Sequence, residues 1–171
     1  MGQRCSNTTS VSFDDVVVSN DNVVGGVGKG FLLAMKTFDA SRPVVASNAV
    51  GISQRVLDIA RLHPESMCLT SDELADLAAQ VEAARLLVRK SALAAEQNDS
   101  SGSVVASMAK LMAGNMAQRY TALSSTANCD TETKLLLDKL YRDAKIFAIY
   151  EGTSEIQKLI IARRILHSNV S

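Results

Sequence analysis

Apolar residues recur at helical spacing along most of this 171-residue sequence, separated by short polar breaks. The spacing predicts helices over approximately residues 31–38, 43–63, 71–98, 104–120, 135–141 and 156–166. Thr70 and Glu73 form the pattern of a capping box before the third of these, and Pro43 suits the first turn of the second. We therefore expect an all-α fold, an antiparallel four-helix-type bundle spanning about Gly30 to Leu166.

Two stretches before residue 30 do not follow the helical pattern. Val11–Val18 is rich in β-branched residues, which predicts a strand. The glycine cluster at residues 25–30 lacks the spacing of a phosphate-binding loop, so a flexible turn into the first helix is favoured over a nucleotide site. The predicted fold is therefore a helical bundle with a short β-type N-terminal segment.

The composition argues against nucleic acid, an anionic membrane and a metal ion as binding partners. Eighteen basic and eighteen acidic residues leave no net field that would attract nucleic acid or an anionic membrane. Cys5, Cys68 and Cys129 are too widely spaced to indicate a disulfide framework or a zinc site, so a reducing, intracellular compartment is favoured. Neither His63 nor His167 has an evident partner, and no metal site is predicted.

The first six residues support a separate hypothesis. Met1–Ser6 matches the N-myristoylation pattern, with Cys5 available for a second, palmitoyl anchor. Such short motifs often match by chance, and the sequence contains no secretory signal and no apolar run of membrane-spanning length. We expect no targeting segment and no membrane partner, and a lipidated membrane-surface protein stays as an alternative.

Candidate chemistry is concentrated in Ile149–Gln157. There a single carboxylate, Glu151, precedes a glycine and two hydroxyl residues that could begin a helix. Gln157 follows Ser154 by three positions, as in a capping box. A carboxylate held in such a turn is a plausible general base.

A second pair of charged residues lies near the junction of the first two predicted helices. Asp39 and Arg42 are three positions apart, which on spacing alone predicts a surface ion pair of little energetic value.

Tyr150–Gln157 closely resembles the C-terminal signature of the acyl-CoA dehydrogenase family, and the resemblance includes the flanking segments 142–146 and 159–163. Residues 38–44 resemble the family's Phe-Asp-x-x-Arg-Pro-Val segment. Met1–Arg4 and Val16–Val18 resemble the close of its middle β domain. The resemblance implies that residues 1–29 are a remnant of that domain with a linker, that residues 30–171 are the C-terminal helical domain, and that Met1 occupies an internal position.

The resemblance also implies roles for individual residues. Glu151 matches the family's catalytic base, which removes the α-proton of an acyl-CoA thioester while the β-hydride leaves to FAD. The backbone at Gly152 is expected to help hold the thioester, and Asp39 and Arg42 are expected along the acyl-CoA binding path. The flavin is expected to be approached by Thr153, Ser154 and Glu155.

The implied reaction is oxidation of an acyl-CoA to a 2-enoyl-CoA, with an electron-transfer flavoprotein as electron acceptor. A homo-oligomer, or a partner that supplies the absent domains, is also expected. The implied location is the mitochondrial matrix in a eukaryote and the cytoplasm in a bacterium.

Two segments depart from the family pattern. Residues 61–70 contain neither the Phe nor the Gly of the family's Arg-x-x-Phe-Gly segment, which holds flavin across a subunit interface. Residues 123–128 stand in place of its Gln-x-x-Gly-Gly-x-Gly stretch. We therefore do not expect this chain alone to bind FAD tightly. A catalytically inactive helical module for interaction or oligomerisation is the alternative to an enzymatic function.

Overall fold

The computed structural model describes residues 1–67, 69–97, 99 and 101–167. Its α-helices are α1 (Gly30–Leu62), α2 (Ser71–Glu96), α3 (Gly102–Ser124), α4 (Thr131–Ala144) and α5 (Ser154–His167). Two short 3-10 helices, η1 (Asn20–Asn22) and η2 (Lys145–Ala148), complete the regular structure. The described part of the chain contains no strand. The prediction of an all-α fold is confirmed, whereas the predicted helix end at Asn98 and the Cys68 thiol lie outside the described residues.

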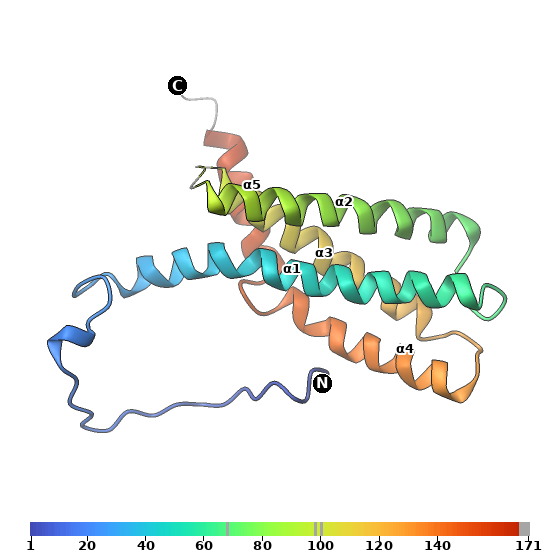
Figure 1. Ribbon diagram of the computed structural model, residues 1–171, viewed down its shortest axis with the longest axis horizontal. Coiled ribbons are helices and arrows are strands. Elements are labelled where there is room, and N and C mark those ends of the chain that lie inside the picture. The colour runs from blue at the N-terminus through green and yellow to red at the C-terminus, as the bar shows by residue number, and fades with distance from the viewer. Residues whose placement is uncertain (68, 98, 100, 168–171) are drawn as a thin grey trace.

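The helices α1 to α4 lie side by side, and the chain reverses direction from each to the next (Figure 1). α3 lies at the centre, because it packs against α1, α2, α4 and α5. α5 leaves the bundle at a steep angle after the loop that follows η2 (Figure 1). The residues around Glu151 therefore lie where α1, α3 and α5 meet.

Short-range hydrogen bonds begin α2 where the sequence predicts them. The Thr70 side chain accepts a hydrogen bond from the Glu73 N–H at 3.2 Å, and the Glu73 carboxylate accepts one from the Thr70 N–H at 2.9 Å. The bond from the Thr70 N–H, and then one that the Thr70 hydroxyl donates to the same carboxylate at 3.1 Å, hold the pKa of Glu73 below its ordinary value, because both favour the ionised carboxylate. The predicted capping box is confirmed.

The predicted break before Pro43 is wrong, since α1 continues through this residue as one helix of 33 residues. Proline removes one intrahelical hydrogen bond, which disfavours an interior position. Arg42, Pro43, Val45 and Ala46 are all buried. Because α1 packs against both α2 and α3, burial of this segment outweighs the local cost of the proline.

The strand predicted at Val11–Val18 is also wrong. Residues 4–30 are all exposed, and this segment runs as an extended, irregular stretch beside the bundle (Figure 1). A β-branched run forms a strand only when another strand supplies hydrogen bonds, and the described residues offer none.

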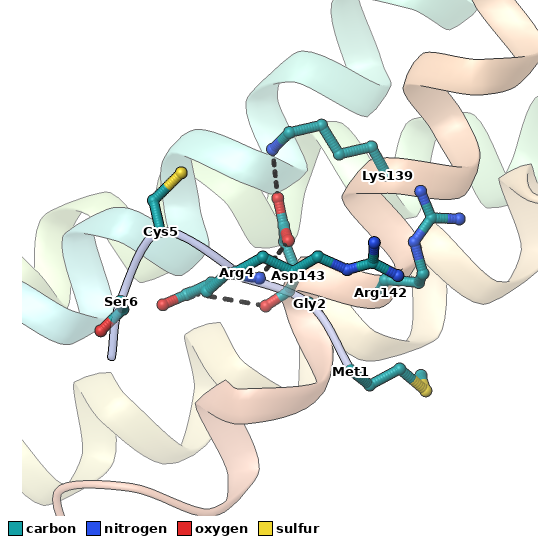
Figure 2. Close-up of a pocket in the computed structure, with 9 residues that line it drawn as sticks. Met1, Gly2, Arg4, Cys5, Ser6, Lys139, Arg142 and Asp143 are labelled. Atoms are coloured by element: carbon teal, nitrogen blue, oxygen red, sulfur yellow. Dashed lines mark hydrogen bonds and ion pairs between the residues drawn. The ribbon is translucent and has the colours of Figure 1, made fainter. Parts of the chain in front are cut away.

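The first six residues contact the bundle, chiefly at α4. Residues 1–6 pass over the C-terminal part of α4, where the Gln3 N–H donates to the Asp143 carboxylate at 2.5 Å (Figure 2). The same carboxylate pairs with Lys139. Together these contacts hold the pKa of Asp143 below its ordinary value, although burial opposes the shift more than any single contact favours it. A pocket of about 700 Å³ forms between residues 1–6 and α4, and none of the residues expected to bind acyl-CoA or flavin lines it.

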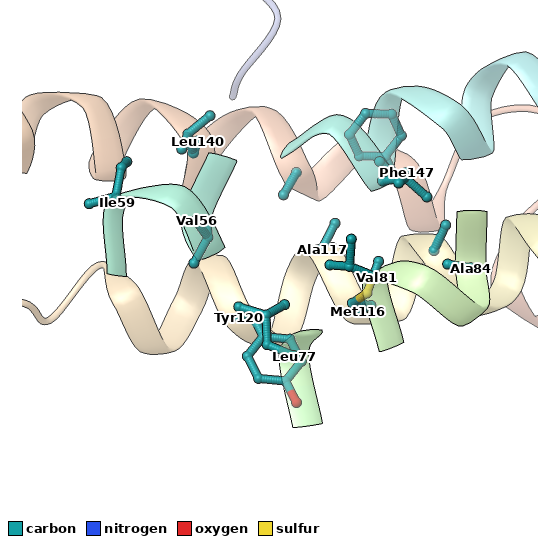
Figure 3. Close-up of a cluster of buried hydrophobic side chains, with 14 of the residues drawn as sticks. Val56, Ile59, Leu77, Val81, Ala84, Met116, Ala117, Tyr120, Leu140 and Phe147 are labelled. Carbon is teal, nitrogen blue, oxygen red and sulfur yellow. The ribbon is translucent and has the colours of Figure 1, made fainter. Parts of the chain in front are cut away.

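The core is built largely from small and aliphatic side chains on α1, α2 and α3 (Figure 3). Val56, Leu77 and Tyr120 are fully buried, and the Tyr120 hydroxyl accepts a hydrogen bond from Gln80. Gly114 lets η2 approach α3 closely, since a Cβ there would lie 2.9 Å from the Phe147 carbonyl oxygen. Alanine and glycine on α3 therefore let the surrounding helices pack tightly.

We expect Leu77→Ala to lower the free energy of unfolding by roughly 2–5 kcal/mol, because it leaves a cavity at a fully buried position. Leu86→Ala, on the same helix at a position 55% exposed, is the matched control and should change it by less than about 1 kcal/mol. Urea denaturation followed by circular dichroism measures both. Equal losses in the two variants would contradict the arrangement of α2 described above.

Candidate functional site

The candidate base lies in a tight turn between η2 and α5. Glu151 has φ 56° and Gly152 has φ 91°, so two consecutive residues adopt left-handed backbone conformations. Glycine adopts this conformation freely, whereas for glutamate it costs on the order of 1 kcal/mol or more. The surrounding structure must supply contacts that hold Glu151 in it.

Three buried side chains bind the carbonyl groups of this turn. Arg42 Nε donates to the Glu151 carbonyl at 3.3 Å, and Lys110 Nζ donates to the Gly152 carbonyl at 2.5 Å. Gln157 Nε2 lies within hydrogen-bonding distance of both carbonyls, at 3.3 Å and 3.0 Å. Their residues are 3%, 1% and 0% exposed, respectively. The turn is therefore held from α1, α3 and α5 at once.

These contacts determine where the backbone N–H groups point. All described peptide bonds are trans, so the N–H of Gly152 points opposite to the Glu151 carbonyl. That carbonyl faces the buried donors, which directs the Gly152 N–H away from them. No described residue accepts a hydrogen bond from this N–H. The turn can therefore offer a backbone donor to an oxygen atom of a bound molecule.

The Glu151 carboxylate accepts a hydrogen bond from the Ser41 hydroxyl. Ser41 precedes Arg42 on α1, so two adjacent residues of one helix bind the side chain and the backbone of Glu151. Glu151 is partly exposed, and its carboxylate is thus oriented without being enclosed.

Asp39 and Arg42 form an ion pair at 2.5 Å, but the pair is not the surface pair that spacing alone predicts. Arg42 is buried, and the Asp39 carboxylate also accepts a hydrogen bond from Ser103 of α3 at 2.8 Å. The pair therefore links α1, α3 and the Glu151 turn. A groove of about 470 Å³ lies beside it, lined by Lys36, Asp39, Ala40, Ala94, Ala95, Asp99, Gly102 and Ser103.

The three residues predicted to approach a flavin differ in exposure. Thr153 is partly exposed and Glu155 is exposed, whereas Ser154 is only 8% exposed. The pKa of the Glu155 carboxyl is held below its ordinary value, first by its own backbone N–H and then by the Thr153 hydroxyl. Thr153 and Glu155 therefore reach the surface, and Ser154 is largely buried.

The capping box predicted from Ser154 and Gln157 does not form. Thr153 instead caps α5, since its hydroxyl oxygen accepts from the Ile156 N–H at 3.4 Å. The Gln157 amide reaches back past the helix start to the carbonyls of the turn. The longer reach of glutamine, together with complete burial, favours these carbonyls over a cap.

Sequence reasoning missed Ser41, Lys110 and Gln157 as parts of the site. Lys110 carried a detectable signal, because it is the one charged residue on the buried face that α3 forms with Val105, Ala109, Ala113 and Ala117. A lysine in such a stripe must either reach solvent or bind a buried acceptor.

Burial chiefly, and then the nearby Arg42 guanidinium, lowers the pKa of Lys110 to about 8. The carboxylates of Glu151 and Glu155 oppose this shift. The ammonium group is therefore close to its titration range at neutral pH.

No group of three or more His, Cys, Asp or Glu side chains among the described residues is placed to hold a metal ion. None of the described helices is both long enough and apolar enough to cross a bilayer.

Gly152→Ala and Gly51→Ala should change stability in opposite directions. A Cβ at Gly152 would lie 2.6 Å from Gln157 Nε2 on a left-handed backbone, so we expect a loss of about 1–3 kcal/mol. Gly51 is exposed within α1 with nothing within 4 Å of its Cβ position, so alanine should add up to about 1 kcal/mol. Thermal unfolding of the two variants tests this, and a stabilised Gly152→Ala protein would contradict the described turn.

Residues 28–166 match the profile described as acyl-CoA dehydrogenase, C-terminal domain. The chain is 38% identical to the probable medium-chain specific acyl-CoA dehydrogenase 2, mitochondrial, of Caenorhabditis briggsae, across 97% of this chain and 42% of the relative. It is also 38% identical to the short-chain specific acyl-CoA dehydrogenase, mitochondrial, of Sus scrofa, across 98% of this chain and 44% of the relative.

The fold is similar to a solved structure of glutaryl-coenzyme A dehydrogenase in complex with glutaryl-CoA, with a TM-score of 0.78 and 28% identity. That similarity covers 90% of this chain and 42% of the solved chain. The chain thus spans less than half the length of each of these three proteins.

Proposed function

The chain belongs to the acyl-CoA dehydrogenase family, in which it corresponds to the C-terminal domain, and on this premise we propose that it supplies the base for flavin-dependent α,β-oxidation of an acyl-CoA. The observation that carries the proposal is the geometry of the Glu151–Gly152 turn. It presents a carboxylate fixed by Ser41 beside a backbone N–H directed away from the buried donors.

The proposed chemistry needs both groups. The α-proton of a thioester is weakly acidic, and a hydrogen bond to the thioester oxygen stabilises the negative charge that forms there as the proton leaves. The Gly152 N–H is proposed as one donor to that oxygen, and the Glu151 carboxylate as the group that takes the proton. The α C–H bond breaks, its electron pair forms the new double bond, and the β-hydride departs.

The exposed face of the turn is compatible with a flavin. Thr153 and Glu155, which begin α5 and reach the surface, are the residues proposed to contact it, and the buried Ser154 is proposed to support them. When bound, FAD supplies the two-electron acceptor for the β-hydride. An electron-transfer flavoprotein is proposed to reoxidise it.

Asp39 and Arg42 are proposed to serve the acyl-CoA binding path in different ways. Asp39 borders the groove that α1 forms with the end of α2 and the start of α3, where its carboxylate can meet a polar part of the substrate. Arg42 is buried behind the turn and binds Asp39 and the Glu151 carbonyl. Its contribution is to hold both in place.

Because the chain spans less than half of its relatives, activity is proposed for an assembly that contains the other domains. The direct experiment combines the chain with the N-terminal and middle domains of a relative, adds an acyl-CoA in D₂O, and follows deuterium uptake at the α-carbon by mass spectrometry. Uptake that depends on Glu151 supports the proposal. No uptake in a folded, substrate-binding assembly would contradict it.

A catalytically inactive interaction module is the second candidate. Large apolar side chains are exposed on the first half of α1 and along α5, namely Phe31, Leu32, Val44, Ile156, Leu159, Ile165 and Leu166. Exposed apolar side chains in this number favour contact with another subunit or domain. The deuterium-uptake experiment separates the two candidates, because an inactive module would give stable assembly without exchange.

A further inference from the structure

We propose that Lys110 is a positioning residue for the Glu151 turn, in which its ammonium group holds the Gly152 carbonyl inward and so keeps Glu151 in its left-handed conformation. The inference rests on the proposed function for its catalytic meaning and on the described contacts for its geometry.

The environment of Lys110 supports this role. The residue is 1% exposed, and its recorded hydrogen-bond acceptor among the described residues is the Gly152 carbonyl oxygen at 2.5 Å. Burying an ammonium group in a stripe of alanines is unfavourable unless its hydrogen bond is strong. An apolar residue would pack in this stripe without such a penalty, so the contact itself is the physical reason for a lysine here.

Lys110 and the other two donors have separate tasks. Of the two turn carbonyls, Arg42 binds that of Glu151, and the Gln157 side-chain amide is shared between both. The Gln157 Oε1 atom is buried without a recorded partner among the described residues, so this amide is not fixed at both ends. Among the described residues, Lys110 is thus the one charged donor to the Gly152 carbonyl, and it fixes the peptide group that leads into α5.

A change in the protonation state of Lys110 should alter its hydrogen bond to the Gly152 carbonyl. The charged groups that act on this lysine are Arg42 of α1, Glu151 of the turn and Glu155 of α5. Burial and Arg42 lower the pKa of Lys110 to about 8, while the two carboxylates raise it. Loss of the proton replaces a charge-assisted hydrogen bond with a weaker one from a neutral amine. The Gly152 carbonyl should report this change.

The experiment uses the full chain labelled with ¹³C and ¹⁵N. We expect the Gly152 carbonyl ¹³C resonance to titrate with a midpoint near pH 8, and we expect this titration to vanish in Lys110→Met and Lys110→Arg. The backbone N–H of Gln157 donates to the Thr153 carbonyl at 3.0 Å. Its hydrogen exchange with solvent should become roughly ten- to a hundred-fold faster in Lys110→Met. Lys110→Arg retains a charged donor and should restore much of this protection.

Lys90→Met removes an exposed lysine of α2 and is the matched control, which should leave both readouts unchanged. Amide exchange at Val81, in the core-facing part of α2, reports global stability. The proposal is overturned by a wild-type Gly152 resonance that does not titrate near pH 8. It is also overturned if the backbone N–H of Gln157 exchanges at the wild-type rate in a folded Lys110→Met protein.

The wild-type titration requires no variant, so misfolding of Lys110→Met would still leave a decisive measurement. Neither readout requires turnover. Failure of the Lys110 proposal is therefore distinguishable from failure of the catalytic proposal, which is decided by deuterium uptake.

Discussion

Replacement of Glu151 by glutamine is expected to slow α-proton abstraction by about 10²–10⁴-fold in an assembly that turns over an acyl-CoA. The amide has nearly the same shape as the carboxylate and can still accept the hydrogen bond from Ser41. It is not a base at neutral pH. Contacts of the backbone with Arg42, Lys110 and Gln157 do not involve the changed atoms, so acyl-CoA affinity should change little.

Deuterium uptake at the α-carbon and the dissociation constant of the acyl-CoA are measured separately in this comparison. Glu132→Gln, at an exposed position in the first turn of α4, makes the same chemical change far from the turn and should leave both values unchanged. Near-normal uptake in Glu151→Gln would remove Glu151 from the mechanism. A loss of affinity with normal uptake would assign it to binding instead.

Local sequence signals were reliable where local physics decides the structure. The capping box at Thr70 appears as predicted, and the helix predicted after it buries Leu77, Val81 and Ala84, since capping and amphipathic spacing act within one helix. The break predicted at Pro43 and the strand predicted at Val11–Val18 are wrong because the state of both elements depends on distant partners. Packing against α3 keeps Pro43 helical, and no strand is present in the described residues to pair with the valines. The capping box predicted from Ser154 and Gln157 is also wrong, because the buried Gln157 side chain binds the turn carbonyls instead.

The contacts of the candidate site also depend on residues that are distant in the sequence. The resemblance indicated the segment that contains Glu151, but two of the three side chains that hold the carbonyls of its turn come from α1 and α3, up to 109 residues earlier in the chain. Arg42 was recognised as half of an ion pair, whereas its bond to the Glu151 carbonyl depends on how α1 crosses the turn. Lys110 was not recognised from the sequence as part of the site. Its acceptor could not be named without the three-dimensional arrangement.

The chain purified alone is expected to retain far less than one flavin per molecule. The family resemblance implies that the isoalloxazine ring lies between the helical domain and the middle β domain, and residues 28–166 match the helical domain. On the side that is present, Thr153 and Glu155 offer few contacts, and Ser154 is largely buried. So few contacts cannot offset the entropy lost when a large ligand is immobilised.

The two segments that depart from the family pattern support the same expectation. They form the connections between α1 and α2 and between α3 and α4, and they contact each other directly, since the Asn128 N–H donates to the Ser66 carbonyl at 3.1 Å. In this chain the two connections form a backbone hydrogen bond with each other, and they do not contain the residues that the family pattern uses to bind flavin. The loss of cofactor contacts is thus expected at both places.

Purification in saturating FAD, followed by desalting and measurement of the visible flavin absorbance, tests this expectation. Thr153→Ala taken through the same column is the matched control, because it removes a proposed flavin contact and leaves nonspecific carry-over unchanged. Equal, low flavin content in both proteins is the expected result. A stoichiometric yellow wild-type protein together with a depleted Thr153→Ala variant would contradict it. The helical domain would then bind the cofactor on its own, and the start of α5 would supply a larger share of the binding energy than we expect from its contacts.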